Sequence, residues 1–372
     1  MPAASPSVTV AVPASPFAVA VSADGCHVFA SLMGQGSQRG IAVFRRAGGK
    51  MELRRVVPLR SNPAGMALTH DGRQLLVAAG DAVAFLDVRR LVSGDGEAVA
   101  GYLDSPPRSQ SIYVNVTPDD KLAFVSEESS ASISVIDLER ARANGFRAAA
   151  RIGSIPVGLA PIALTFSREA KLLYTTSQAA LPEWEWPKAC KPEGRGGANA
   201  RPVNPEGAVV VIDVARARMD PATAVVARIP AGCSPVRMAI APDGGRIYVT
   251  ARNSNAVLAF DTAKLLTDQE HARIGAVPVG AAPVPVAVVA NGRRVVAGNS
   301  NRFGGREAQD LTVIDASRME SGAAAVMGTI AAGAFPREMT VSADGRTLFL
   351  ANFGSDSLQM IDVERLPVRG NR

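Results

Sequence analysis

Two sets of polar residues in this chain of 372 residues have the types and spacing for ligand chemistry. One set follows a proline by one or two residues, at the start of an apolar run: Arg108, Arg237, Arg337 and Glu338. The other set follows a second apolar run: Glu127, Glu128, Arg252, Asn253, Asn299, Asn301 and Asn352. Arginine forks suit the capture of a carboxylate or phosphate, and asparagine amides suit the orientation of hydroxyl groups. If both sets reach one face, they predict a site for a small anionic or polar ligand.

The same residues are compatible with two other interpretations, which the sequence leaves open. Glu127, Glu128 or Glu338 could act as a base beside an arginine that stabilises a developing oxyanion. Alternatively, these side chains could only pair with one another and brace loops. A metal site and a Ser-His-Asp triad are not expected, because only three dispersed histidines are present: His27, His70 and His271. No haem or quinone motif occurs, so no cofactor is expected.

A repeated unit must position these residues, because one pattern recurs seven times along the chain. Each copy has two apolar runs joined by a tight turn, as in "RMAIAPDGGRIYVTA", and a third run that mostly ends in Asp, as in "AVLAFD". Asp-Gly between alternating apolar runs is a strong hairpin signal. The turns are 47 to 53 residues apart except for one spacing of 75, and they lie at Asp24, Asp71, Asp119, Arg168, Asp243, Asn291 and Asp344.

A fourth apolar run, such as "VVARIP", completes each unit, so each unit forms four antiparallel strands. The last copy stops after its third run, "LQMID", and the N-terminal run "SVTVAVP" can supply the missing strand. The sequence therefore predicts an all-β, seven-bladed β-propeller, a single domain over residues 1–372, closed by the N-terminal strand in the last blade. The Asp-Gly turns would lie on one face, and both polar sets at the channel mouth on the other.

The stretch "RIYVTARNSNAVLAFD" resembles the repeat of the YVTN family of β-propellers, with Tyr248-Val249-Thr250-Ala251 at the tetrapeptide that names the family. The resemblance covers essentially the whole chain apart from one insertion. It implies the seven-bladed fold shared with lactonase-like propellers of the 6-phosphogluconolactonase type, a fold that hosts many activities. The leading interpretation is a propeller that binds a small anionic or polar ligand, or a protein partner, at its channel mouth. The alternative is a metal-independent, lactonase-like hydrolase or isomerase that acts on a small carboxylated or sugar-derived ring.

The insertion, at about residues 178–207 in the fourth unit, accounts for the spacing of 75. It contains both tryptophans, Trp184 and Trp186, and we expect a lid whose tryptophans cover either a ligand or the neighbouring blade. Cys190 in the insertion and Cys233 at the start of the next unit would lie on the same face, so a disulfide is expected. A disulfide implies the periplasm or the cell exterior, whereas three reduced thiols would imply the cytoplasm.

Composition narrows the classes of partner. The chain is 47% hydrophobic and 20% charged, which is typical of a globular protein. Its net charge of +6 is spread out, and basic residues never run longer than pairs, so no nucleic acid is expected. Prolines at 278, 283 and 285 interrupt the most apolar stretch, which excludes a membrane-spanning helix there. The N-terminus lacks the apolar core of a signal peptide. We also expect a bacterial protein that is monomeric.

Overall fold

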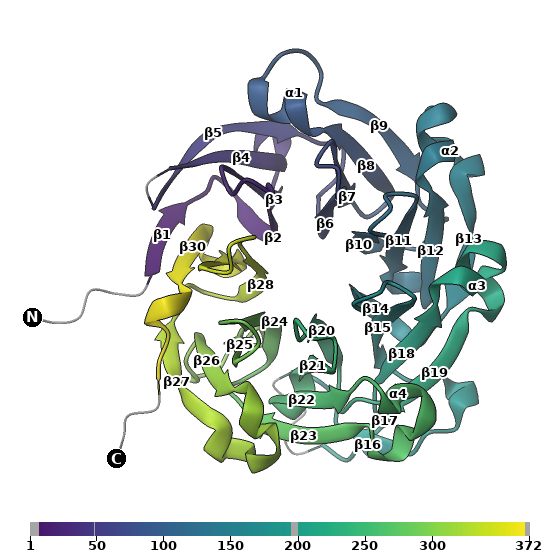
Figure 1. Cartoon of the computed structure of the whole chain (residues 1–372), viewed down its shortest axis with the longest axis vertical. Helices are drawn as coiled ribbons and strands as arrows, with labels where there is room; N and C mark the ends of the chain where they lie inside the picture. The colour runs from purple at the N-terminus through teal and green to yellow at the C-terminus, as the bar shows by residue number, and fades with distance from the viewer. Residues whose placement is uncertain (1–6, 48, 195–199, 369–372) are drawn as a thin grey trace, which may run out of the picture.

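The computed structural model describes residues 7–47, 49–194 and 200–368. Seven four-stranded antiparallel sheets are arranged in a ring around a central channel (Figure 1). Within each sheet the strands follow one another from the centre outwards, so every sheet is one blade. The seven-bladed β-propeller with four antiparallel strands per blade, predicted from the repeats, is therefore confirmed.

The first three blades comprise β2 (Ser15–Val21), β3 (His27–Met33), β4 (Gly40–Ala47) and β5 (Lys50–Pro58); β6 (Met66–Leu68), β7 (Gln74–Ala78), β8 (Ala82–Asp87) and β9 (Val99–Asp104); and β10 (Ser111–Val116), β11 (Leu122–Glu127), β12 (Ser132–Asp137) and β13 (Arg151–Pro156). The fourth and fifth blades comprise β14 (Leu159–Phe166), β15 (Leu172–Ala179), β18 (Ala208–Asp213) and β19 (Val225–Pro230); and β20 (Pro235–Ile240), β21 (Arg246–Ala251), β22 (Ala256–Asp261) and β23 (Arg273–Pro278). The last two comprise β24 (Pro283–Val289), β25 (Arg294–Asn299), β26 (Asp310–Asp315) and β27 (Val326–Ala331); and β28 (Pro336–Val341), β29 (Thr347–Asn352), β30 (Ser357–Asp362) and β1 (Ser7–Ala11).

Short helices connect the strands. The α-helices are α1 (Val88–Ser93), α2 (Leu138–Ala143), α3 (Val214–Met219) and α4 (Lys264–Thr267). The 3₁₀ helices of the described part are η1 (Gly36–Gln38), η2 (Glu128–Ser130), η3 (Ala148–Ala150), η4 (Pro182–Trp184), η5 (Pro221–Thr223), η6 (Arg252–Ser254), η7 (Gln269–His271), η8 (Ala316–Ala325), η9 (Phe353–Ser355) and η10 (Val363–Arg365). No described helix has the length and apolar character needed to cross a membrane.

The recurring aspartates have two different structural roles. In the turns, Asp243 accepts a hydrogen bond from the backbone of Gly245 at 2.9 Å, and Gly244 between them has a φ of +77°, which favours glycine. At the end of a third strand, Asp213 accepts a hydrogen bond from the Arg216 backbone at 2.9 Å and so caps α3. Asp87 and Asp137 cap α1 and α2 in the same way. Where the third run of a copy ends in Asp, this residue is thus a helix or turn cap and lies away from the channel mouth.

The N-terminal strand completes the seventh blade, as predicted. β1 pairs antiparallel with β30, from Ser7 opposite Ile361 to Ala11 opposite Ser357. In Figure 1 β1 accordingly lies beside β30, and β2 of the first blade packs against β28 of the seventh. The two ends of the chain therefore share one sheet, which leaves no unpaired outer edge on β30.

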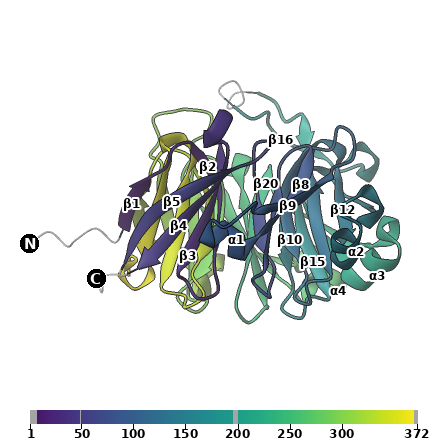
Figure 2. The ribbon, with the colours of Figure 1, turned by 90° about the horizontal axis from the view of Figure 1, so that it is seen from above.

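The hydrophobic core is divided among the spaces between neighbouring blades. Phe124 and Val135 of the third blade, for example, pack with Val210 of the fourth, and all three side chains are fully buried. Burial of side chains of this size contributes about 1.5–3 kcal/mol each. Seen from the side (Figure 2), α2, α3 and α4 lie toward one face, and β16 (Lys188–Cys190) of the insertion lies at the opposite face. The insertion therefore projects from the face opposite the helices, which we call the mouth face.

Candidate functional site

Three polar side chains from non-adjacent blades meet at the channel. Tyr113 of β10 donates a hydrogen bond to Glu338 Oε1 of β28 at 3.3 Å. Arg237 of β20 places its Nε 2.9 Å from Glu338 Oε2, and its guanidinium carbon lies 4.6 Å from the centre of the Tyr113 ring. Each residue lies at a β-bulge near the start of its inner strand. A bulge redirects side chains, which explains how three separate strands aim polar groups at one point.

The neighbouring bulge positions carry apolar side chains that close off the channel beside this cluster. They pack with one another as a single buried group: Phe17, Ile112, Ile162, Val236 and Val284. The channel at this depth is therefore filled with side chains, and the polar cluster is poorly hydrated. Arg237 is 4% exposed and Glu338 is 7% exposed. Burial raises the pKa of Glu338, while Arg237 and Arg337 partly offset this increase. Burial likewise raises the pKa of Tyr113, so its hydroxyl keeps the proton that it donates.

Arg237 has fewer partners than a buried cation normally has. Its Nε is close to Glu338, but the N–H is not directed at the carboxylate oxygen, so the contact is an ion pair without an aligned hydrogen bond. None of its three nitrogens has a hydrogen-bond partner among the described residues. Buried polar groups are nearly always hydrogen-bonded, and an unsatisfied charged group costs more than a neutral one. The guanidinium of Arg237 therefore has hydrogen-bond donors that no described residue uses.

Arginines and phenylalanines alternate along the mouth face in what we call the arginine–phenylalanine row. Phe17 lies 5.9 Å from the guanidinium carbon of Arg237 and 4.2 Å from that of Arg337. Phe335 lies 5.5 Å from Arg337 and 5.7 Å from Arg302. Phe303 lies 5.3 Å from Arg302 and 5.9 Å from Arg252. Each ring thus contacts two cations, an arrangement that stabilises guanidinium groups at partly dry sites.

The row concentrates positive charge. Burial, together with the nearby charges of Arg237 and Arg302, lowers the pKa of Arg337 to about 9. Burial and the charge of Arg252 also lower the pKa of Arg302. Each guanidinium destabilises the charge on its neighbour, so the mouth face favours negative ions.

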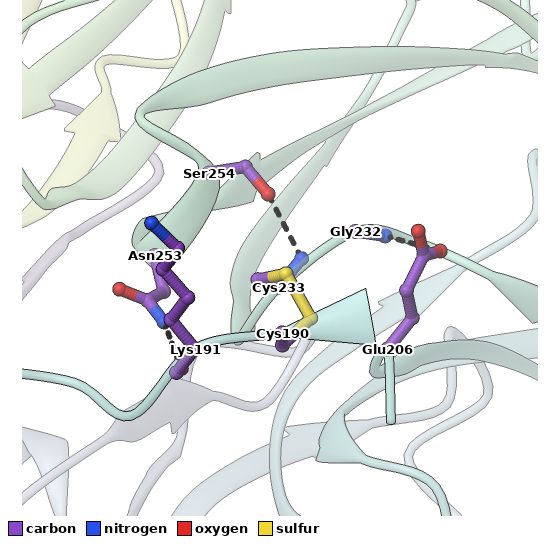
Figure 3. Close-up of a disulfide and its surroundings, with 7 residues drawn as sticks. All are labelled: Cys190, Lys191, Glu206, Gly232, Cys233, Asn253 and Ser254. Atoms are coloured by element: carbon purple, nitrogen blue, oxygen red, sulfur yellow. Dashed lines mark hydrogen bonds between the residues drawn. A yellow bond between two sulfur atoms is a disulfide. The ribbon is translucent and has the colours of Figure 1, made fainter. Parts of the chain in front are cut away.

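The outer end of the row is attached to the insertion. Arg252, 5% exposed, binds both oxygens of Glu193 at 2.9 and 2.7 Å and also donates to Gln178 Oε1 at 2.7 Å. Asn253 donates to the Lys191 carbonyl at 2.8 Å (Figure 3). Arg252 and Asn253 were predicted as ligand contacts. In the structure the Nε and Nη2 of Arg252 and the Nδ2 of Asn253 hold the insertion in place.

The sulfur atoms of Cys190 and Cys233 form a disulfide, with Cα atoms 5.5 Å apart (Figure 3). Cys26 is free and exposed. The Cys233 backbone donates to Ser254 Oγ at 2.9 Å, and Gly232 donates to Glu206 at 3.2 Å. The insertion is therefore fixed to the fifth blade by a covalent bond as well as by an ion pair. Beside the disulfide is a groove of about 550 Å³, lined by residues including Arg252, Asn301 and Phe303.

The tryptophans lie on the neighbouring blades. Trp184 and Trp186 contact each other edge to face at 5.3 Å and pack against the core shared by the third and fourth blades. Arg228 of the outer strand β19 lies 5.0 Å from the centre of the Trp184 ring. Of the two expected roles, covering a ligand or covering a neighbouring blade, this placement matches the second, because both rings pack on the apolar surface of the blades. The rings that contact Arg237 and Arg337 belong to Phe17, Tyr113 and Phe335.

Several other predicted site residues act as braces within a blade. Glu127 accepts hydrogen bonds from Ser111 at 2.7 Å and Ser134 at 2.8 Å, and burial raises its pKa. Asn299, Asn301 and Asn352 donate to groups in their own blades. Arg108 is exposed and Glu128 is half-buried. Within the described ranges, no group of three or more His, Cys, Asp or Glu is placed to hold a metal ion.

Five residues of this region were not predicted as site residues from the sequence: Phe17, Tyr113, Arg302, Phe303 and Phe335. Alignment of the inner strands could have found two of them. Phe17 follows Pro16 as Arg337 follows Pro336, and Tyr113 lies two residues after Ser111 as Glu338 lies two after Pro336. Arg302, Phe303 and Phe335 belong to loops of irregular length, for which the repeat gives no register.

Comparisons with known proteins agree with the fold. The family model described as "Lactonase, 7-bladed beta-propeller" matches residues 206–366, whereas no curated protein matches the chain in sequence. Among solved structures, hydrazine synthase from Kuenenia stuttgartiensis has a TM-score of 0.66 at 19% identity, over 95% of this chain and 97% of that one. A chain of the mitotic checkpoint complex has a TM-score of 0.68 at 12% identity, over 96% and 93%. At such identities the two structures show the fold alone, and the family match over residues 206–366 agrees with the seven-bladed ring: the chain is a β-propeller that is similar to the lactonase-like propellers over that part of its length.

Proposed function

We propose that this propeller binds a small anionic ligand at the channel mouth, through Arg337 and Arg237. The observation that carries the proposal is the buried guanidinium of Arg237, whose three nitrogens have no hydrogen-bond partner among the described residues. A carboxylate that reached it would supply charge-assisted hydrogen bonds, which are among the strongest in proteins. Arg337 contacts the same ring, Phe17, that Arg237 contacts, and it adds a second cation. The disulfide supports export of the protein to an oxidising compartment, the periplasm or the cell exterior.

Binding is favoured over catalysis because two of the three candidate bases, Glu338 and Glu127, are engaged. Glu338 forms an ion pair with Arg237 and accepts the Tyr113 hydroxyl, and Glu127 accepts two serine hydroxyls. A general base must be within hydrogen-bond reach of the proton that it removes, in a form able to accept it. The alternative, a lactonase-like hydrolase, is supported by the family match and by the raised pKa of Glu338 beside two arginines. Turnover of a carboxylated lactone that is lost in Glu338→Gln would support this alternative over simple binding.

Arg337→Met is the variant that tests binding most directly. Arg337 is half-buried and forms no ion pair or hydrogen bond with the described residues, so its loss removes a cation without leaving a partner unpaired. We expect it to weaken the binding of glucuronate or benzoate by about 1.5–3 kcal/mol in calorimetry. The melting temperature should change little. Arg108→Met, an exposed arginine on the same face, is the matched control and should bind like the wild type. Equal affinities for wild type and Arg337→Met would refute the proposal.

A further inference from the structure

The arginine–phenylalanine row has a carboxylate at each end and none in its middle. At one end Glu338 pairs with Arg237, and at the other Glu193 binds Arg252 with both oxygens. The two middle arginines, Arg337 and Arg302, form no hydrogen bond or ion pair with any residue in the described part of the chain. Both contact the same ring, Phe335, with guanidinium carbons 5.5 and 5.7 Å from its centre.

From this arrangement we infer that the ligand is a dicarboxylate whose two carboxylate groups are joined by a short apolar segment. One carboxylate binds Arg337, the other binds Arg302, and the segment between them lies over Phe335. This inference rests on the proposed anion binding and specifies the class of ligand. It requires a ligand with two negative charges, because two guanidinium groups lie against the same ring and neither is in an ion pair with a described residue.

The apolar surface beside the two arginines is larger than one ring. Phe353 packs against Phe335 edge to face, with ring centres 5.4 Å apart, and both rings are partly buried. A methylene chain over these rings would lose contact with water, which stabilises the complex by about 0.8 kcal/mol for each buried CH₂. A purely polar dianion would not gain this contribution. The rings therefore favour aliphatic or aromatic dicarboxylates over hydroxylated ones.

Charge repulsion within the row favours two carboxylates over one. Arg302 and Arg237 both lower the pKa of Arg337, which shows that the guanidinium groups repel one another. A monocarboxylate relieves this repulsion at one arginine only. The bidentate pair of Arg252 and Glu193, with N–O distances of 2.9 and 2.7 Å, shows the same interaction already formed within this row. Glu193 binds Arg252 with both oxygens, so Arg252 is not available to the ligand. The inner carboxylate of the ligand binds Arg337 beside the unpartnered nitrogens of Arg237, and the outer carboxylate binds Arg302.

The accessibility of the two arginines differs in a way that helps the test. Arg302 is exposed and lies in the loop between β25 and β26, whereas Arg337 is half-buried in β28. Arg302→Met should therefore fold normally, and it removes only the outer of the two proposed contacts. Its effect on a dicarboxylate can then be compared directly with its effect on a monocarboxylate of equal length.

Calorimetry on the full chain should compare succinate, glutarate, adipate and suberate with butyrate, valerate, hexanoate, octanoate and inorganic phosphate. We expect the best dicarboxylate to bind the wild type at least about tenfold more tightly than the matching monocarboxylate. Arg302→Met should abolish that difference and leave the monocarboxylate unchanged, whereas Arg108→Met should preserve it.

Each contrary outcome has a separate meaning. Equal binding of mono- and dicarboxylates to the wild type would overturn the inference and leave the proposed anion binding intact. Tighter binding of phosphate than of any dicarboxylate would also overturn it, because phosphate places its charges on one group. An unchanged dicarboxylate preference in Arg302→Met would remove Arg302 from the site. If none of these anions bound, both the inference and the proposed function would be rejected.

Discussion

Replacement of Arg237 by Met should destabilise the protein because it leaves the Glu338 carboxylate buried without its cation. Glu338 is 7% exposed, and the Arg237 Nε lies 2.9 Å from its Oε2. Removal of one partner from a buried ion pair typically costs 3–5 kcal/mol. The Tyr113 hydroxyl and the charge of Arg337 remain near Glu338, so the lower end of the range applies. We therefore expect a loss of about 3 kcal/mol in the free energy of unfolding at pH 8.

The loss should depend on pH in a defined direction. Burial already raises the pKa of Glu338 above its ordinary value of 4.5, and Arg237 partly offsets that increase. Without Arg237 the pKa rises further. A carboxyl group whose pKa is higher in the folded state favours folding when protonated, and this contribution is lost as pH rises from about 4.5 through the folded pKa. The destabilisation by Arg237→Met should therefore be smaller at pH 5 than at pH 8.

Urea denaturation at both pH values, with two further variants, measures these effects. Arg237→Met combined with Glu338→Gln removes the buried charge, so it should recover most of the lost stability and most of the pH dependence. Arg246→Met is the control in the same blade, because Arg246 donates to the Ala316 carbonyl at 3.0 Å and not to a carboxylate. It should cost about 1 kcal/mol at either pH. If Arg237→Met were as stable as the wild type at pH 8, or equally destabilised at both pH values, the assignment of Arg237 as the partner of Glu338 would be refuted.

Two further predictions concern the pairing of β1 with β30 and the disulfide that attaches the insertion to the fifth blade. Deletion of residues 1–12 removes the five paired residues of β1 and exposes the edge of β30. The stability should fall by several kcal/mol, measured as a lower melting temperature, and the protein should associate more. An unchanged melting temperature would contradict the view that β1 stabilises the ring by completing the seventh blade. The double variant Cys190→Ser, Cys233→Ser opens a loop with a sequence separation of 43 and should lose about 4 kcal/mol in the chain-entropy model. Thiol titration of the unreduced, denatured wild type should find one thiol, Cys26, whereas three thiols would show that no disulfide forms.

The fold was predictable because every blade has the same local sequence pattern. A tight turn, alternating apolar runs and a capping Asp occur in almost every unit, so a unit with a weak pattern can be assigned by comparison with the others. The pairing of β1 with β30 was predictable for a related reason, since the seventh copy lacks one strand and only the N-terminal run has the matching pattern. The family resemblance supported the same number of blades.

The site was only partly predictable, because its residues are selected by the shape of the bulges and loops. Arg237, Arg337 and Glu338 were identified from their proximity to prolines at strand entrances, and the structure brings them together. Asparagines and Arg252 were indistinguishable from them in sequence, yet their donors are taken by neighbouring carbonyls and carboxylates. The tryptophans show the same limit of prediction. The position of the insertion between two strands of the repeat indicates the face from which it projects, but it does not indicate the surface on which its side chains pack.

Closure of the ring and the geometry of the candidate site depend on the same contact, between the first and seventh blades. Phe17, which lies between Arg237 and Arg337, is the third residue of β2, and β2 packs against β28, the strand that carries Arg337. Only three residues separate β2 from β1, the strand that completes the sheet of β28. A change that detaches β1 from β30 would therefore loosen the segment that leads into β2, and with it the position of Phe17 beside the arginines, although β2 stays paired with β3. Loss of the N-terminal strand should thus weaken anion binding at temperatures where the remaining blades are still folded, because the ligand site includes the joint between the two ends of the chain.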